Sequence, residues 1–289
     1  MGKEETPVTI IIPAHDEEKG IEKVISGIKN AMEDMNLTYE LIVVDDGSTD
    51  KTAQIVKEKE DVRLIQHPYN KGYGAALKTG VKNAEGNVVL FIDADAQQNP
   101  DDIPRLLKPM DEYDMVVGAR ARGSKISLLR RPGKFVLGVL ANYLAGMKIP
   151  DLNSGFRAIK KEIVTKYMYI LPDTFSFTTT ITLAAIKEGY NIKYIPIETV
   201  KGLGTSKIKP FRDGFRFIML ILRTIVFFDP MKVFLPVSII LFVMGFIYLI
   251  HNLIFYLNVP DASVLLIASS IIIFLFGLLA DQISLMRRQ

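Results

Sequence analysis

The stretch VTIIIPAHDEEKGIEKVISGIKNAMEDMNLTYELIVVDD, Val8–Asp46, contains two short apolar runs separated by a longer amphipathic segment. The runs VTIII and ELIVV are rich in β-branched residues, which favour strands. Between Glu18 and Met35, apolar residues recur at the spacing of one helix face: Ile21, Val24, Ile25, Ile28 and Met32. The stretch therefore predicts a strand, a helix and a second strand parallel to the first.

The same alternation continues as far as residue 119. The runs VRLIQ (62–66), NVVLFI (87–92) and DMVVGA (114–119) are again short and β-rich, with helical patterns between them. Alternating strands and helices predict an α/β fold, in which a Rossmann-like, mostly parallel sheet is covered by helices on both faces. Ligands of such sheets bind beyond the carboxyl ends of the strands.

Acidic residues follow two of the predicted strands. Asp45 and Asp46 end one run, and Asp93 and Asp95 end another, VVLFIDADAQQNP. Residues i and i+2 face the same way at a strand end, so Asp93 and Asp95 can contact the same ligand. A cation bound between them would relieve the repulsion of their charges. Oxygen ligands without Cys or a nearby His favour Mg²⁺ or Mn²⁺. Two simpler interpretations stay open: solvated acids after a strand, and an ordinary turn with a helix cap in DGSTDKT.

Composition narrows the class of protein. The chain has 289 residues, 49% of them hydrophobic, and no cysteine, which excludes disulfides and thiolate metal sites. Residues 1–119 carry 13 Lys/Arg and 23 Asp/Glu, whereas residues 120–289 carry 22 and 9. The basic half is also the apolar half, so it predicts phosphate groups or an anionic membrane surface as partners and not nucleic acid.

Two segments near the end of the chain are long and apolar enough to span a bilayer, Val233–Leu257 and Ser263–Leu285. They predict a transmembrane hairpin; the alternative is a pair of buried helices in a soluble protein. The connector 258–262 has no Lys or Arg, while Lys232, Arg287 and Arg288 flank the two spans. The positive-inside rule therefore predicts that both termini, and with them the α/β domain, are cytoplasmic.

A further helix is predicted between Phe211 and Phe228. At 100° per residue, Arg212, Arg216 and Arg223 share one face of an otherwise apolar cylinder, which is typical of a helix in the membrane interface. A third span is the competing interpretation. The segment Lys134–Ala145 is also suited either to the lipid surface or to the core. The predicted domains are residues 1–210 (the α/β domain), 211–232 (interfacial helix and linker) and 233–289 (hairpin).

Six motifs in order resemble family 2 glycosyltransferases: IIPAHDEEKGI, VVDDGSTDKT, NKGYGAAL, DADAQQNP, DLNSGFRAIKK and GLGTSK. The resemblance is closest to the branch that transfers a sugar from a nucleotide to a polyprenyl or dolichyl phosphate. It covers about residues 7–232 and implies a GT-A fold, a nucleotide sugar donor, a divalent metal and a single inverting displacement. The hairpin resembles that of the two-span members of this branch.

The resemblance also implies roles for individual residues. Those framing the base and ribose would be Pro13, Ala14, Glu17, Asp45 and Asp46. Lys71 and Ala94 would lie near the donor, and Mg²⁺ or Mn²⁺ on the diphosphate would be held by Asp93, Asp95 and Gln97. Asp151 stands where related enzymes often place a base. Because a phosphate monoester is largely dianionic at neutral pH, Asp151 is predicted to orient other groups, with a catalytic role left open.

The run ARARGSKISLLRRPGK, 119–134, carries a cluster of cations without an acid. The residues that would bind the acceptor phosphate are Arg120, Arg130, Arg131, Lys134 and Lys207. Of these, Arg131 is also assigned to catalysis. Arg120 could instead contact the diphosphate, and the whole group could be a solvated positive face.

Two other functions stay open. A processive polysaccharide synthase would share the fold, but such members carry Q-x-x-R-W and this chain has no tryptophan. A non-catalytic, membrane-tethered binder of nucleotide sugars would keep the fold without the chemistry. The donor could be a UDP or a GDP sugar, with a weak preference for UDP, and a homo-oligomer is possible.

Overall fold

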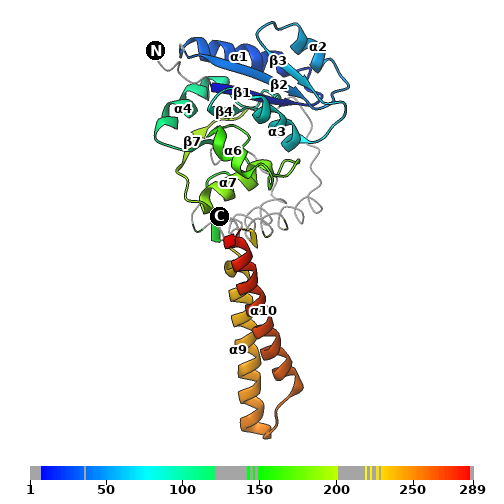
Figure 1. Cartoon of the computed structure of the whole chain (residues 1–289), viewed down its shortest axis with the longest axis vertical. Coiled ribbons are helices and arrows are strands. Elements are labelled where there is room, and N and C mark those ends of the chain that lie inside the picture. The colour runs from blue at the N-terminus through cyan, green and yellow to red at the C-terminus, as the bar shows by residue number, and fades with distance from the viewer. Residues whose placement is uncertain are drawn as a thin grey trace. The chain divides into compact units, whose positions relative to one another are not determined.

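The computed structural model describes residues 8–35, 37–120, 142–143, 146, 149–200, 219, 222, 226–227 and 229–286. The chain divides into two compact units, Met1–Gly214 and Phe215–Gln289. Figure 1 shows the first as a sheet with helices around it and the second as a helical hairpin. The three predicted domain boundaries stay predictions.

The first unit is built on a seven-stranded sheet with the order β3-β2-β1-β4-β6-β5-β7. Neighbouring strands are parallel, except that β6 runs antiparallel to both β4 and β5. The strands are β1 (Val8–Ala14), β2 (Tyr39–Asp45), β3 (Arg63–Gln66), β4 (Val88–Phe91), β5 (Met115–Arg120), β6 (Arg157–Lys160) and β7 (Ile192–Ile197). The prediction of an α/β fold with a mostly parallel sheet is confirmed.

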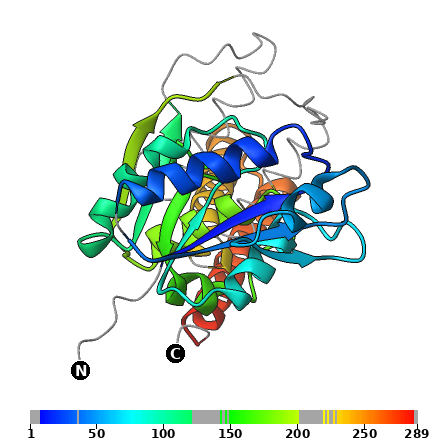
Figure 2. The same ribbon diagram turned by 90° about the horizontal axis from the view of Figure 1, so that it is seen from above.

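Helices cover both faces of this sheet, as Figures 1 and 2 show. They are α1 (Ile21–Glu33), α2 (Thr52–Lys57), α3 (Tyr73–Asn83), α4 (Ile103–Leu107), α6 (Lys161–Tyr167) and α7 (Phe177–Lys187), with short 3-10 turns η1 (Pro100–Asp102) and η2 (Lys108–Asp111). Ile10 and Ile12 of β1 pack in one core with α1 and α4. Ile11 points to the other face, where Gly80 of α3 packs directly against it. Because both faces are covered, β1, β2, β4 and β5 are mostly buried apolar runs, whereas the edge strands β3 and β7 are only partly buried.

The five predicted apolar residues of α1, from Ile21 to Met32, are all buried, so the predicted helix face is confirmed. The reversed strand β6 matters for the position of the site. Its first residue, Arg157, lies opposite Phe91 at the end of β4 and Val117 of β5. The segment that enters β6 therefore meets the carboxyl ends of the parallel strands at the same edge.

The second unit contains two long helices, α9 (Met231–Tyr256) and α10 (Asp261–Met286), whose most apolar 18-residue windows have mean hydropathies of 2.7 and 2.6. Only 11% and 17% of their most apolar windows are buried, so these are not core helices of a soluble protein. Length, composition and exposure are typical of a membrane hairpin. The predicted hairpin is confirmed at 231–286.

Small residues form the seam between these two helices. The buried residues of α10 recur every seven positions, at Ser263, Ser270, Gly277 and Ser284, and α9 has Ser238 and Gly245. A Cβ at Gly245 would lie 2.9 Å from the Leu266 Cβ, and one at Gly277 would lie 2.7 Å from the Phe234 Cβ. Small side chains let two helices approach closely where lipid gives no hydrophobic driving force.

We expect Gly245→Leu to destabilise the hairpin by about 1–3 kcal/mol, because the new side chain must displace α10. The full-length protein in detergent should unfold at a lower temperature than wild type. Val243→Leu, on an exposed face of the same helix, is the matched control and should not change the unfolding temperature. Equal stability of the two variants would contradict the close packing at Gly245.

The arginines of the predicted interfacial helix, Arg212, Arg216 and Arg223, lie outside the described residues. The same holds for residues 134–141, 144 and 145 of the segment Lys134–Ala145, which is suited to the lipid surface or to the core. The interfacial helix 211–228 stays a prediction, and for the segment 134–145 the lipid surface and the core both stay open.

Candidate active site

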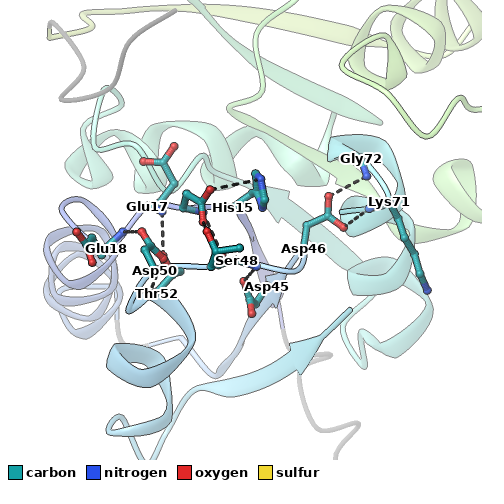
Figure 3. Close-up of polar contacts among 12 residues, drawn as sticks. His15, Glu17, Glu18, Asp45, Asp46, Ser48, Asp50, Thr52, Lys71 and Gly72 are labelled. Carbon is teal, nitrogen blue, oxygen red and sulfur yellow. Dashed lines mark hydrogen bonds and ion pairs between the residues drawn. The ribbon is translucent and has the colours of Figure 1, made fainter. Parts of the chain in front are cut away.

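The loops that follow β1 and β2 are joined by reciprocal hydrogen bonds, drawn in Figure 3. The Thr49 amide donates to the Asp16 carboxylate over 2.8 Å, and the Asp16 amide donates to the Ser48 Oγ over 3.0 Å. Further along, the Glu18 amide donates to the Asp50 carboxylate over 3.1 Å. The sequence DGSTDKT thus forms the turn that its composition suggested. Pro13 and Ala14 end β1 directly before this joined pair of loops, and Glu17 lies within it.

Asp45 and Asp46 are both buried at the end of β2. Asp45 accepts hydrogen bonds from the Ser48 amide at 3.1 Å and the Gln66 side chain at 3.2 Å. Asp46 contacts His67 and also accepts from the amides of Lys71 and Gly72, at 2.9 and 2.8 Å. Burial alone would raise the pKa of Asp46, but the hydrogen bonds from His67 and these two amides outweigh it and lower the pKa. Asp46 is therefore an ionised anchor for the loop that carries Lys71.

The side chain of Lys71 is exposed, with its Nζ 5.7 Å from the centre of the Tyr69 ring. Figure 3 shows it pointing away from Asp46. Direct contacts of Pro13, Ala14, Glu17, Asp45, Asp46 and Lys71 with a nucleotide stay predictions.

A polar cavity lies at the edge of the sheet where β4 and β5 end and β6 begins. Its lining comes from several separate segments: Asp93, Asp95, Gln97, Gln98, Arg120, Asn153, Ser154, Gly155, Ile197 and Thr199. The structure thus brings together four of the predicted site residues. Ala94 is buried between the two aspartates and packs against Gly20 at the start of α1.

Asp93 and Asp95 do not extend β4, which ends at Phe91, but lie in a turn where Ala96 has a φ of 56°. Both nevertheless line the cavity. The Asp93 carboxylate accepts hydrogen bonds from the Tyr73 hydroxyl at 2.8 Å and from the Gln98 amide at 2.6 Å. Burial, followed by the charge of Asp95, raises the pKa of Asp93.

Gln97 is oriented by Asp95. Its backbone amide and its side-chain amide donate to the Asp95 carboxylate over 3.0 and 2.6 Å. Burial raises the pKa of Asp95 even so. Because the nitrogen of the Gln97 side chain faces Asp95, its oxygen is the atom left to bind a cation.

These groups fit a hard divalent cation. Two carboxylates with raised pKa values face one cavity, and a cation would stabilise their ionised forms. Within the described ranges, no three His, Asp or Glu side chains converge into a complete metal site. This composition suits an ion that takes several of its oxygen ligands from a bound diphosphate and water.

Arg120 and Asp151 form a two-pronged ion pair beside the cavity. The Arg120 Nε and Nη2 donate to the two Asp151 carboxylate oxygens over 2.7 and 3.0 Å. Burial alone would raise the pKa of Asp151, but the hydrogen bonds and charge of Arg120 outweigh it, so this pKa lies below its ordinary value. An acid held ionised in this way is a weak proton acceptor, which favours the predicted orienting role.

The structure adds residues that the sequence analysis did not assign to the site: Tyr73, Gln98, Asn153 and Gly155. All of them lie inside motifs quoted above, but nothing in the motifs distinguished them from their neighbours. Asn153 accepts a hydrogen bond from Thr179 of α7 at 2.7 Å and lines the cavity. The remaining predicted acceptor residues, Arg130, Arg131, Lys134 and Lys207, lie outside the described residues.

Comparison with known proteins places two parts of the chain. Residues 9–168, more than half of the chain, match the sequence profile of glycosyl transferase family 2, and residues 229–286 match that of the GtrB C-terminal hairpin.

Among curated relatives, a UDP-N-acetylglucosamine–dolichyl-phosphate N-acetylglucosaminyltransferase of Methanococcus voltae is 31% identical, covering 74% of this chain and 95% of the relative. A dolichol-phosphate mannosyltransferase of Pyrococcus furiosus is 35% identical, over 54% of this chain and 47% of the relative.

A solved structure of glucosyl-3-phosphoglycerate synthase from Mycobacterium tuberculosis, in complex with Mn²⁺, UDP and phosphoglyceric acid, superposes with a TM-score of 0.59. It is 23% identical and covers 76% of this chain and 78% of that one. At this identity the likeness concerns the fold alone, and it confirms the GT-A architecture.

Proposed function

The chain belongs to glycosyl transferase family 2, and from this we propose that it transfers a sugar from a nucleotide sugar to a polyprenyl phosphate at a membrane surface. The observation that carries the proposal is the cavity at the carboxyl edge of the sheet that is lined by Asp93, Asp95 and Arg120, with Arg120 held by its ion pair to Asp151. The named activities of the Methanococcus and Pyrococcus relatives and the C-terminal hairpin support a lipid-linked acceptor.

Asp93 and Asp95, with the side-chain oxygen of Gln97, would hold Mg²⁺ or Mn²⁺ on the diphosphate of the donor. When bound there, the ion stabilises the negative charge that develops on the departing nucleoside diphosphate. The related fold that was solved with Mn²⁺ and UDP supports this arrangement. The loops after β1 and β2, with Lys71, would hold the nucleoside; UDP and GDP both fit, and the N-acetylglucosaminyltransferase relative favours UDP.

The acceptor phosphate would attack the anomeric carbon of the sugar as the bond to the diphosphate breaks. Arg120, fixed by Asp151, would stand beside the reacting phosphates. Arg130, Arg131, Lys134 and Lys207 would bind the acceptor phosphate, as the sequence analysis predicts. No protein base is required, because a phosphate monoester with a second pKa near 6 is already a strong enough nucleophile at neutral pH.

This assignment predicts the pH dependence of transfer. The rate should rise with pH through about 6 as the acceptor becomes dianionic. Asp151 has a lowered pKa, so it is ionised throughout this range and should contribute nothing to the rise. Asp151→Asn should slow transfer by about 10- to 100-fold by freeing Arg120, without moving the midpoint.

An acceptor that carries a phosphonate, whose second pKa is higher, should shift the midpoint to higher pH in both proteins. If the rise of the rate with pH is instead absent in Asp151→Asn, and its midpoint in wild type is the same with phosphate and phosphonate acceptors, Asp151 is the base.

The hairpin would anchor the protein with its connector outside and the catalytic unit in the cytoplasm. Because the chain has no cysteine, single-cysteine variants report sidedness cleanly. A membrane-impermeant maleimide should label Asn258→Cys in intact cells and Lys108→Cys only after permeabilisation. The reverse pattern would overturn the orientation.

A direct test of function uses the full-length protein in detergent, Mg²⁺ or Mn²⁺, a short-chain polyprenyl phosphate and a panel of radiolabelled UDP and GDP sugars. The expected product is one sugar joined to the lipid through a phosphodiester. Polymer formation would show a processive synthase, and binding of a nucleotide sugar without any product would show a binding protein.

A further inference from the structure

We propose that Tyr73 is a positioning residue that fixes the Asp93 carboxylate for the divalent cation, and that the loop 171–176 holds Tyr73 in place. This inference rests on the proposed metal-dependent function. It says that residues outside the acidic motif hold the Asp93 carboxylate in position. It concerns how the site is held in shape and not which sugar is transferred.

The Asp93 carboxylate is held on three sides. One oxygen accepts from the Tyr73 hydroxyl over 2.8 Å, and the other accepts from the Gln98 side chain over 2.6 Å. Gln98 also accepts from the Asp93 backbone amide, over 2.9 Å, so it grips both parts of the residue. On the third side, a Cβ at Gly155 would lie 2.7 Å from both the carboxylate and the Tyr73 hydroxyl.

This arrangement leaves capacity for a cation. Each carboxylate oxygen has two lone-pair sites, and the two hydrogen bonds use one on each oxygen. The remaining sites keep a defined direction because neither oxygen can rotate without losing a bond. Hydrogen bonds of this kind to metal-binding carboxylates set their orientation and raise metal affinity.

Tyr73 is itself held by a loop that is distant in sequence. It is the first residue of α3, and the next two amides, of Gly74 and Ala75, donate to the Asp173 carbonyl over 3.0 and 3.3 Å. Its ring stacks on Phe175 with the ring centres 5.1 Å apart and the planes inclined by 21°. Lys78 adds an ion pair with Asp173 at 2.7 Å.

Phe175 is 80% exposed, so its contact with Tyr73 contributes little to the core of the protein. The stacked ring limits where the Tyr73 hydroxyl can point. The loop is thus connected to Asp93 through one side chain, and a change at Phe175 should alter the metal site more than it alters the fold.

The test measures Mn²⁺ binding directly, by electron paramagnetic resonance, to the full-length protein in detergent. Mn²⁺ is added alone, with UDP and with GDP. Tyr73→Phe keeps the ring and removes only the hydroxyl, and it should weaken Mn²⁺ binding by about 10- to 100-fold. Nucleotide binding in EDTA, and the unfolding temperature, should match those of wild type.

Tyr113→Phe is the matched control, since Tyr113 lies before β5 and packs against the core away from the cavity. It should bind Mn²⁺ as wild type does. Phe175→Ala should weaken Mn²⁺ binding in the same direction by a smaller factor, which keeps the test decisive if Tyr73→Phe does not fold.

If Tyr73→Phe and Phe175→Ala are folded and bind Mn²⁺ as tightly as wild type, the inference is overturned while the proposed function stands. If wild type binds no Mn²⁺ with either nucleotide, the metal site itself is wrong and the inference falls with it. Loss of Mn²⁺ binding only in proportion to unfolded protein would also overturn it, because it would show a purely structural role.

Discussion

Asp95→Asn is expected to lower the rate of sugar transfer by at least about 10²–10³-fold, the scale of losing a charged group that stabilises the departing diphosphate. The amide has nearly the same shape but no charge, so the cation loses half of its protein carboxylates. EDTA should lower the transfer rate of wild type to the same extent, and added Mn²⁺ or Mg²⁺ should restore that rate. The readout is product formation in the radiolabelled assay.

Asp101→Asn is the matched control for this variant, because Asp101 is an exposed acid in η1, a few residues beyond the cavity. It should transfer sugar at the wild-type rate. Full activity of wild type in EDTA, or of Asp95→Asn with metal, would refute the metal-dependent mechanism.

Gly155→Ala is expected to have the second largest effect, a loss of about 10²-fold in transfer, the scale of displacing a reacting group by about 1 Å. The new methyl group would lie 2.7 Å from the Tyr73 hydroxyl and the Asp93 carboxylate, so one of these must move. The variant should fold, because the Asp93 side of the residue is a cavity wall and not the packed core.

Gly189→Ala separates this local effect from general destabilisation. Gly189 lies in an exposed turn with a φ of +76°, where any side chain is strained but meets no atom within 4 Å. It should lower the unfolding temperature without changing the rate of transfer by the folded protein. Equal rates for Gly155→Ala and wild type would show that Asp93 tolerates displacement.

The strands β1 to β5 could be predicted because each lies in a short β-rich run; β1, β2, β4 and β5 are largely buried, whereas the edge strand β3 is only partly buried. β6 could not, because Arg157–Lys160 is only four residues long and has a cation at each end. Its reversed direction depends on tertiary pairing with β4 and β5, which no local pattern records. The mostly parallel sheet was therefore predictable, but the orientation of one strand was not.

The acids of the site were predictable for a similar reason. Strand ends are recognisable in the sequence, so Asp93 and Asp95 could be placed at one edge of the sheet, where both line the cavity; the cation stays a proposal. Their supports could not be predicted, since Tyr73, Gln98 and Gly155 reach Asp93 through the packing of three separate segments. Asp46 is a further example: the resemblance implies that it binds the donor, which stays a prediction, and the structure adds that it anchors the loop of Lys71 and Gly72, which the sequence could not predict.

The reversed direction of β6 also affects how the chain can vary. Because β5 ends and β6 begins at the same edge of the sheet, Gly118 of β5 lies beside Phe156, the residue before β6, although 37 residues separate them in the sequence. The Arg120–Asp151 ion pair joins the end of β5 to the segment that precedes β6. The pairing of β5 with β6 depends on contacts such as Val117 with Arg157 and not on the number of residues between the strands, so a change of length between Arg120 and Asp151 is expected to leave this pairing unchanged.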